Sequence, residues 1–204
     1  MKALAVQSLE EILVECEQLH GHMCAGQLLG ARMALLGCRL VGLDDPRGVD
    51  RRKTIVWVEI DRCMADAVSA ATGVRLGKRS LKYVDYGKVA ATFLNTETNK
   101  AVRVVARESS RALADERFGS IANKRERQFR AYTEATDEEL FASEFVRLEL
   151  NEMDAPGSPR SRVICAVCKE GVNDGREVVR RDGSVVCRGC AGETYYKKPD
   201  NPKA

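Results

Sequence analysis

Four cysteines in two pairs near the C-terminus constrain the fold of this 204-residue chain more than any other feature. Each pair has the spacing C-x2-C, eighteen residues separate the pairs, and the four residues are Cys165, Cys168, Cys187 and Cys190. This spacing is typical of a structural zinc site, in which four thiolates occupy tetrahedral corners about 2.3 Å from the ion. The sequence therefore predicts a four-cysteine zinc finger over residues 162–204.

The residues between the two pairs indicate how this finger folds. Asp182 and Gly183 separate two short β-prone segments and are a strong signal for a hairpin turn. So small a segment, with few apolar side chains, needs the ion in order to fold. Paired disulfides, a rubredoxin-like iron site and a redox C-x2-C pair are the alternatives, of which a reducing compartment disfavours the first.

A segment rich in proline and glycine separates the finger from the rest of the chain. Residues 151–161 contain two prolines, a glycine and several small polar side chains, so no regular element is expected there. The preceding part is long enough to bury a core of its own. We therefore expect a core domain over residues 1–150, a linker over 151–161 and the finger over 162–204.

The core sequence predicts helices on both sides of a group of strands. Ser8 and Glu11 have the spacing of a capping box, which predicts a helix from about residue 9. The segments 81–84 and 88–94 are expected to pair as a hairpin. Strands are expected over residues 54–60, 81–84, 88–94, 101–106 and 145–150, and further helices over 24–40, 62–72, 108–135 and 136–143. This grouping predicts an α+β fold.

The only two histidines of the chain, His20 and His22, lie within three positions of each other, and Cys24 follows two residues later. Imidazole and thiolate are the ligand types that suit zinc and similar transition metals. Cys24 also falls near the expected start of a helix, where the helix dipole favours a reactive thiolate. A helix–helix turn whose histidines only cap and pack is the alternative that this spacing leaves open, and a reactive thiol without metal is another.

Composition narrows the class of protein. Apolar residues make up 44% and charged residues 31% of the chain, which is ordinary for a globular protein and excludes wholesale disorder. No apolar run approaches the roughly 18–20 residues of a membrane helix, and the apolar stretch at the N-terminus is too short for a signal peptide. Eight cysteines then favour metal ligands or catalytic thiols in a cytoplasmic protein.

Several motifs, in order along the chain, resemble those of the FmdE family, named after the E subunit of formylmethanofuran dehydrogenase. They are HGHMCAG at residues 20–26, DRCMADA at 61–67, ATGVRLGK at 71–78 and YGKVA at 86–90. The resemblance covers roughly residues 8–150, and family members often carry the same kind of C-terminal zinc finger. The family usually has proline where this chain has Ala25, and the first turn of a helix accepts either residue.

The resemblance implies a thioredoxin-like α+β core with a mixed β-sheet flanked by helices, followed by a treble-clef-type finger. It also implies an active site in the core that holds a metal through His22, Cys24 and Cys63, with His20 as a further candidate ligand. A second zinc or another transition metal bound there, with an open position, could polarise a carbonyl or activate water.

Other residues near these motifs are candidates for a supporting role. Asp61 and Asp66 bracket Cys63, and Lys78 and Lys88 follow in segments that contain glycine. They could contact a metal ligand or a substrate anion, and ordinary solvated charges are the alternative for each. Cys16 and Cys38 fall on apolar helical faces, and we expect them to be plain core residues.

The resemblance implies an FmdE-like metalloprotein linked to molybdenum formylmethanofuran dehydrogenase-type one-carbon metabolism, as an accessory subunit or as a protein that handles a metal or cofactor. Whether it is itself an enzyme is left open. Subunits of the molybdenum enzyme are the expected partners, and a homodimer is expected because the finger, or the small residues of the helix over 24–40, could join two chains. No membrane partner is expected.

A zinc-finger nucleic-acid-binding regulator is the alternative from another class. Residues 100–130 hold nine Lys and Arg against four Asp and Glu, and basic stretches supply salt-dependent affinity for phosphates. The formal net charge is only +3, however, and aromatic residues make up 5% of the chain, so a stacking surface is not expected. Nucleic acid is therefore not expected as a partner.

Overall fold

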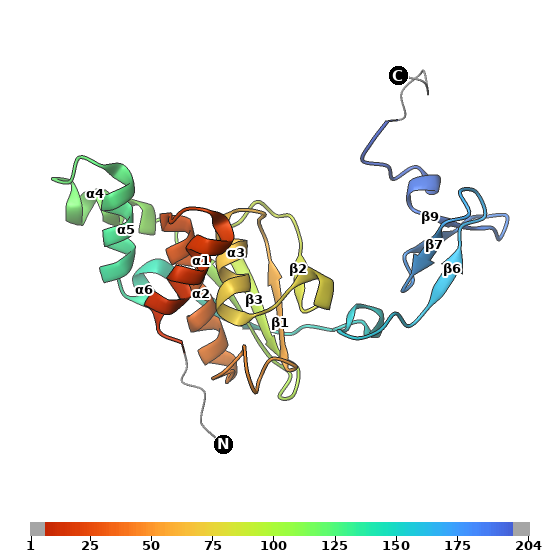
Figure 1. Ribbon diagram of the computed structural model, residues 1–204, viewed down its shortest axis with the longest axis horizontal. Coiled ribbons are helices and arrows are strands. Elements are labelled where there is room, and N and C mark those ends of the chain that lie inside the picture. The colour runs from red at the N-terminus through yellow and green to blue at the C-terminus, as the bar shows by residue number, and fades with distance from the viewer. Residues whose placement is uncertain (1–6, 198–204) are drawn as a thin grey trace. The chain divides into compact units, whose positions relative to one another are not determined.

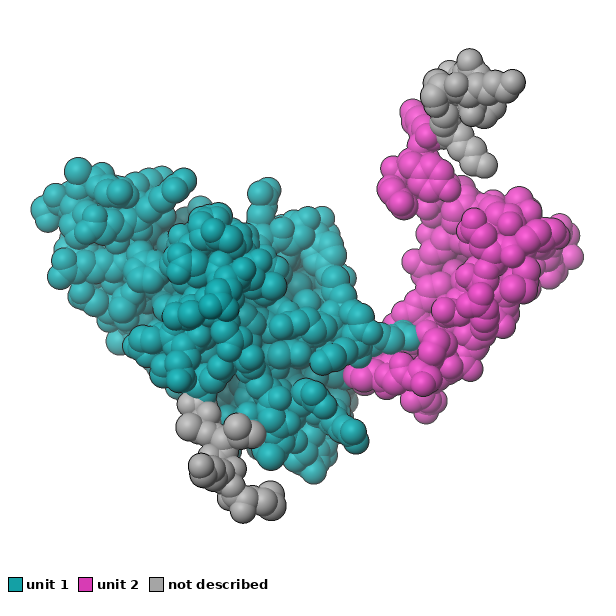
Figure 2. All heavy atoms as spheres, viewed as in Figure 1, with its two compact units in different colours: residues 1–149 teal, residues 150–204 magenta. Residues whose placement is uncertain are grey.

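The β-prone segments of the core assemble into one five-stranded mixed sheet, and the helical segments pack against it (Figure 1). The computed structural model describes residues 7–197. It divides the chain into two compact units, residues 1–149 and 150–204 (Figure 2). The first hexapeptide, which holds part of the N-terminal apolar stretch, and the last seven residues of the expected finger lie outside the described residues.

The first unit contains the elements that carry the core site. Its helices are α1 (Leu9–His20), α2 (Ala25–Val41), α3 (Cys63–Thr72), η1 (Leu76–Lys78, 3-10), α4 (Ser110–Phe118), α5 (Lys124–Glu134) and α6 (Asp137–Leu140). Its strands are β1 (Thr54–Val58), β2 (Leu81–Tyr83), β3 (Ala90–Asn95), β4 (Lys100–Ala106) and β5 (Phe141–Val146). The strand order is β2-β1-β3-β4-β5, with β2 parallel to β1 and the other pairs antiparallel. The α+β class and the mixed sheet agree with the expectation.

The expected hairpin between residues 81–84 and 88–94 is wrong, because β1 lies between these two strands. Val58 pairs with Tyr83 of β2 on one side and with Ala91 of β3 on the other. β1 is apolar on both faces and largely buried, so it takes the inner position with a partner on each edge. The short loop between β2 and β3 therefore crosses over the end of β1.

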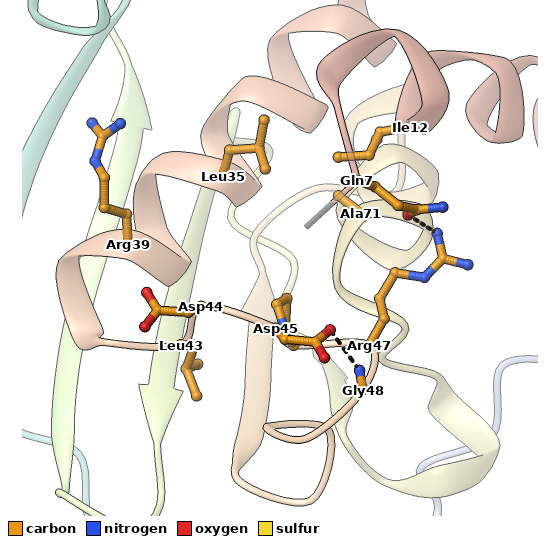
Figure 3. A pocket seen from close by; sticks show the side chains of 11 residues that line it. Gln7, Ile12, Leu35, Arg39, Leu43, Asp44, Asp45, Arg47, Gly48 and Ala71 are labelled. Carbon is orange, nitrogen blue, oxygen red and sulfur yellow. Dashed lines mark hydrogen bonds between the residues drawn. The ribbon is translucent and has the colours of Figure 1, made fainter. Parts of the chain in front are cut away.

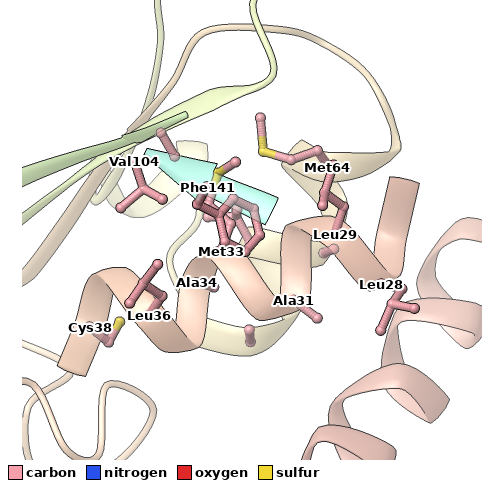
Figure 4. Packing of buried hydrophobic residues seen from close by; sticks show 14 of the residues in the cluster. Leu28, Leu29, Ala31, Met33, Ala34, Leu36, Cys38, Met64, Val104 and Phe141 are labelled. Atoms are coloured by element: carbon pink, nitrogen blue, oxygen red, sulfur yellow. The ribbon is translucent and has the colours of Figure 1, made fainter. Parts of the chain in front are cut away.

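The hydrophobic core lies between the sheet and helix α2 (Figure 4). Val56, Phe93 and Val102 stand side by side in register on three neighbouring strands, and all three are fully buried. Leu28 and Met33 of α2 are buried in the same cluster. Because side chains alternate between the two faces of a strand, this row fixes which face of the sheet meets the helices.

Small residues let α2 approach its neighbours closely. A Cβ atom at Gly30 would lie 2.7 Å from the carbonyl oxygen of Met64 in α3, and one at Gly37 would overlap the Phe93 ring. Both glycines are therefore required by contacts within this chain. The small residues of this helix, which the sequence suggested could join two chains, include Gly30 and Gly37, and these two face α3 and the sheet.

The expected helix over residues 108–135 is two helices, α4 and α5. The break follows Gly119, and the Asn123 side chain caps α5 by accepting from the backbone N–H groups of Arg125 and Glu126. Arg127 joins the two helices through an ion pair with Asp115 at 2.8 Å. The expected helix over 136–143 is also shorter, because β5 begins at residue 141 in order to pair with β4.

Arg32 of α2 fixes the C-terminal end of α5. Its guanidinium donates to the carbonyl oxygens of Tyr132 and Ala135 at 2.7 and 2.6 Å, and to the Asp137 carboxylate at 2.8 Å. These bonds satisfy carbonyl groups that a helix end otherwise leaves without partners. They also hold the end of α5 against α2.

The second unit contains two small antiparallel sheets. Its elements are η2 (Glu152–Asp154), β6 (Arg162–Ile164), β7 (Gly171–Asn173), β8 (Glu177–Val179), β9 (Val185–Cys187) and η3 (Gly189–Ala191). The expected hairpin turn is present, with Gly183 at φ 80° and the Asp182 carboxylate accepting from Ser184. The segment expected as a linker, 151–161, belongs to this unit, where Asp154 forms an ion pair with Arg176.

Within residues 7–197, no helix is both long enough and apolar enough to span a lipid bilayer.

Candidate metal centre

The structure brings His20, Cys24 and Cys63 together in the first unit, with one ligand atom of each within 4.8 Å of the others. His20 is the last residue of α1, Cys24 is the N-cap of α2, and Cys63 is the first residue of α3. Gly21 adopts the left-handed conformation (φ 86°), which ends α1 and turns the chain back toward α2. Three helix ends therefore meet at one point of the core.

His20 joins the two thiols, whereas His22 does not belong to this group of donors. The sequence assigned the ligand role first to His22 and named His20 as the further candidate. His22 is exposed in the turn after α1, and its ring stacks at an angle on His20 with centroids 4.9 Å apart. The last helical turn of α1 packs toward α3, and this places the His20 ring beside Cys63.

Asp66 of α3 orients the His20 ring. Its Oδ2 atom lies 2.8 Å from Nδ1 of His20, so the ring donates its Nδ1 proton to the carboxylate. The other nitrogen, Nε2, then keeps its lone pair for an ion. Carboxylate partners of this kind commonly fix the tautomer of metal-binding histidines.

Gln27, a buried side chain that the sequence analysis did not single out, positions Cys24. Its Oε1 atom accepts from the backbone N–H of Cys24 at 3.0 Å, and its Nε2 donates to the carbonyl oxygen of Cys16 in α1 at 2.7 Å. One amide thereby links the start of α2 to α1. The signal was available, because glutamine three residues after an N-cap is the spacing of a capping box.

The two core thiols are close neighbours with little space around them. A Cβ atom at Gly26 would lie 3.7 Å from Sγ of Cys24 and 3.9 Å from Sγ of Cys63, and only 3.3 Å from Cβ of Cys63. Burial raises the pKa of the Cys63 thiol, and its hydrogen bond with Cys24 raises that pKa further. A positive ion between the sulfurs would reverse both effects, because it favours the thiolates. The donor set and its spacing thus fit a transition-metal ion.

The finger cysteines form a second and different cluster. The ligand atoms of Cys165, Cys168, Cys187 and Cys190 also lie within 4.8 Å of one another, and all four residues are free thiols. Lys169 has φ 64°, which closes a tight turn after the first pair. The backbone N–H of Cys190 donates to Sγ of Cys187 at 3.3 Å, an arrangement that turns the second pair toward the same point.

Backbone donors prepare Cys165 for an ion. The N–H of Cys187 donates to Sγ of Cys165 at 3.3 Å, and this bond, with others from the turn, lowers the pKa of the Cys165 thiol to about 6. Cys165 is fully buried. A thiolate held in this way is the form that binds a metal. With four protein ligands, the cluster has the composition of a closed structural site.

A pocket of about 550 Å³ opens beside the core centre, and Cys63 is part of its wall. Its lining comes from the starts of α2, α3 and α4, from α5 and from the end of β4. Lys88 lines it, as does Arg62, whereas Lys78 and Asp61, which the sequence named as candidates, are exposed outside its lining. A volume between about 300 and 1,000 Å³ is typical of small-molecule sites.

A second hollow, of about 630 Å³, lies between α1, α2 and the loop after α2 (Figure 3). Two of its polar side chains, Asp45 and Arg47, form bonds with neighbouring residues. Asp45 accepts from the backbone N–H of Gly48 at 2.9 Å, and Arg47 bonds Gln7 and pairs with Glu15 at 2.7 Å. Among the described residues, this hollow carries no cluster of three or more potential metal-ligand atoms.

Two further cysteines are buried parts of the core, as expected. Burial raises the pKa of the Cys16 thiol to about 11 and that of the Cys38 thiol to about 12. Both are therefore protonated at neutral pH. They behave as small apolar side chains.

The fold and the two clusters define a small α+β protein with a His/Cys site in its core and a four-cysteine finger. A sequence profile of the FmdE family, described as "FmdE, Molybdenum formylmethanofuran dehydrogenase operon", matches residues 19–142. The chain belongs to the FmdE family.

A relative and a solved structure are similar to the chain over most of its length. A "Probable S-adenosyl-L-methionine-binding protein" of Archaeoglobus fulgidus is 32% identical over 92% of this chain, which spans about half (54%) of that relative. A crystal structure of a protein from Syntrophus aciditrophicus, described as like the FmdE subunit of a tungsten formylmethanofuran dehydrogenase, superimposes with a TM-score of 0.64. It is 24% identical and covers 97% of this chain and 100% of its own, so the fold is shared.

Proposed function

We propose that this protein binds a transition-metal ion, most simply zinc, through His20, Cys24 and Cys63, and a structural zinc through its four finger cysteines. The observation that carries the proposal is the convergence of three donor atoms within 4.8 Å at the wall of a pocket. Two thiolates and a neutral imidazole match the donors of known zinc sites that keep an open position.

The residues around the core centre support this role. Gln27 holds the backbone of Cys24, Asp66 holds the tautomer of His20, and the missing side chain of Gly26 avoids a tight contact with Cys63. With three protein ligands, an ion there would keep one position toward the pocket, where it could polarise a carbonyl or lower the pKa of bound water. The pocket itself would bind and orient the molecule that reaches this position.

The biological role that we propose is that of an accessory subunit, or a metal- or cofactor-handling protein, in formylmethanofuran dehydrogenase-type one-carbon metabolism in the cytoplasm. Family membership supports this role. The finger is then a docking element for subunits of a molybdenum or tungsten enzyme. We also propose a homodimer, because Phe145 is 68% exposed on the edge strand β5, where a second chain could cover it.

Binding of S-adenosyl-L-methionine is a second candidate, suggested by the name of the Archaeoglobus fulgidus relative. Equilibrium dialysis with the labelled compound would test it. The carboxylate of this compound suits Arg62 and Lys88 in the pocket beside the centre, whereas its sulfonium cation would be repelled by the same two residues.

The nucleic-acid alternative has weaker support from the basic stretch 100–130. Six of its nine Lys and Arg side chains pair with acidic side chains or bond backbone carbonyls within the chain: Arg103, Arg107, Arg111, Arg117, Arg127 and Arg130. Groups engaged in this way are poorly placed to contact phosphates.

Counting metal ions per chain tests the proposed function directly. We expect two ions in the wild type, and one in the Cys24→Ser and Cys63→Ser variants, with unchanged far-ultraviolet circular dichroism. Cys38→Ser is the matched control, because Cys38 lies in the core away from the centre, and it should retain both ions. Two ions in all three variants would refute the core site.

A further inference from the structure

The charges that line the pocket beside the core centre indicate what kind of molecule it takes. Four lining residues are basic and one is acidic: Arg62, Lys88, Arg107, Arg111 and Glu108. Two of the basic groups are already engaged. Arg107 donates from Nε to the carbonyl oxygens of Glu138 and Phe141, each at 2.9 Å, and Arg111 pairs with Glu108 at 3.0 Å.

Arg62 and Lys88 remain available to a ligand. Both side chains are exposed at the pocket and have no ion-pair partner within residues 7–197. Their backbones are well fixed, since Arg62 is the N-cap of α3 and Lys88 donates its N–H to the carbonyl oxygen of Glu59 at 3.2 Å. The two positively charged side chains therefore line the pocket from two segments, the start of α3 and the loop before β3.

A buried tyrosine of α5 also lines this pocket. Tyr132 lines the pocket and is only 5% exposed, and its hydroxyl makes no hydrogen bond to another residue in the described part of the chain. Arg32 fixes the position of this residue by binding its carbonyl oxygen. A tyrosine hydroxyl that has no partner in the chain can donate to an oxygen atom of a ligand in the pocket.

The core centre does not itself supply positive charge. Two thiolates cancel the charge of a divalent ion, and the imidazole is neutral. Attraction for an anion must then come from Arg62 and Lys88. The starts of α2 and α3, which line the same pocket, add the positive ends of two helix dipoles.

We propose that this pocket binds a small molecule through an oxyanion group, a carboxylate or a phosphate, held between Arg62 and Lys88 and hydrogen-bonded by Tyr132. This proposal extends the proposed function. It rests on that function only for the metal ion next to the ligand. A molecule bound in this way would reach the open position of the ion with its remaining donor atoms.

Titration of the metal-loaded protein with two simple probes, inorganic phosphate and acetate, tests this site and separates the two kinds of anion. Binding is followed by amide chemical shifts at constant ionic strength. We expect at least one probe to bind at millimolar concentration, with shifts at residues 62–64 and 87–89. Arg62→Ala and Lys88→Ala should each weaken binding at least fivefold, Tyr132→Phe about threefold, and Arg62→Lys should restore part of the affinity.

Lys100→Ala and Arg125→Ala are the matched controls, because each removes one exposed positive charge outside the pocket. They should change the affinity less than twofold. Equal weakening by the controls, or wild-type affinity in both Arg62→Ala and Lys88→Ala, would overturn the proposal.

Metal content measured on the same samples separates this proposal from the function on which it rests. A protein that holds its core ion but binds neither probe refutes the anion pocket alone. A protein that binds a probe through Arg62 and Lys88 but holds no core ion refutes the metal centre and leaves the anion pocket standing.

Discussion

The two cysteine clusters of this protein are built from similar donors but stand in opposite relations to the fold around them. The core centre lies where three helix ends meet on a sheet with an extensive apolar core. The finger has almost no core, because Cys165 and Val186 are the only buried hydrophobic residues among the described residues 150–197. At the core centre, a metal ion would bind to a fold that is already stable. In the finger, a metal ion would be required for folding.

Because of this difference, loss of the ion should affect metal binding alone at the core centre but the stability of the fold in the finger. A site whose scaffold folds by itself can gain and lose its ion, and can leave one position open, without losing its shape. A site that replaces a hydrophobic core must stay closed, because release of the ion removes the fold. The two clusters therefore predict different responses to the same treatments.

Removal of metal should have the largest effect, and only on the finger. In the presence of a strong chelator, or in the Cys187→Ser variant, we expect residues 162–197 to unfold completely, because few apolar contacts remain to hold them. Amide spectra of the two units, recorded with and without chelator, give the measurement. Dispersed signals from β8 and β9 in the chelated protein would contradict the argument, as would a melting temperature of the first unit lowered by more than about 10 °C.

Thiol reactivity should distinguish the metal-free core centre from the buried core by about two orders of magnitude. Burial raises the pKa of Cys38 to about 12, so at pH 8 only about one such thiol in ten thousand is ionised. We expect iodoacetamide to alkylate Cys24 at least 100-fold faster than Cys38, and metal to protect Cys24. The rate at Cys38 should rise about tenfold per pH unit below its pKa. Mass spectrometry of timed samples measures each site, and comparable rates for the two thiols would contradict the assignment.

Replacing the carboxylate that orients His20 should weaken the core ion without releasing the finger ion. Asp66→Asn keeps the shape of the side chain but removes the charge that fixes the histidine tautomer. Partners of this kind contribute about 10- to 100-fold in metal affinity. Competition with a calibrated chelator measures the change, and Asp61→Asn, an exposed neighbour, is the control. An unchanged affinity in Asp66→Asn would show that the hydrogen bond does not serve the metal.

The smallest expected difference comes from adding one methyl group beside each cluster. A Cβ at Gly26 would press on Cys63 at 3.3 Å, so Gly26→Ala should weaken the core ion by about threefold to tenfold. Gly189 also adjoins a ligand sulfur, but there the new Cβ would lie 3.8 Å from Sγ of Cys187, an ordinary contact. Gly189→Ala should therefore leave the finger ion unchanged. Chelator competition on both variants measures the two affinities, and equal effects at both positions would remove this distinction.

Much of the fold could be predicted because the signals are local. The capping box of Ser8 and Glu11 and the turn at residues 182–183 both act within a few residues. The order of the strands could not be predicted in this way. The insertion of β1 between β2 and β3 depends on which edges of the sheet need partners, and this is a property of the assembled layers.

The same distinction between local signals and the assembled fold applies to the residues of the candidate site. The resemblance named Cys24 and Cys63 as candidate ligands, with His22 first and His20 as a further candidate. The structure places His20 beside the two cysteines, because the choice between the histidines depends on how far α1 extends before its turn. Tyr132 was missed entirely. It lies about seventy positions from Cys63 in sequence, and the packing of α5 against α2, where Arg32 binds the end of α5, brings it to the pocket.

The close approach of α2 and α3 at Gly30 has a consequence for the choice of ion. Because Cys24 and Cys63 stand at the beginnings of these two interlocked helices, their separation is set by the packing of rigid rods before any ion arrives. A fixed distance between the two sulfur atoms favours ions of matching radius. The protein cannot increase this distance without moving a whole helix. A bulkier residue at Gly30, which touches no candidate ligand, would push the two helices apart and so disturb the spacing of Cys24 and Cys63.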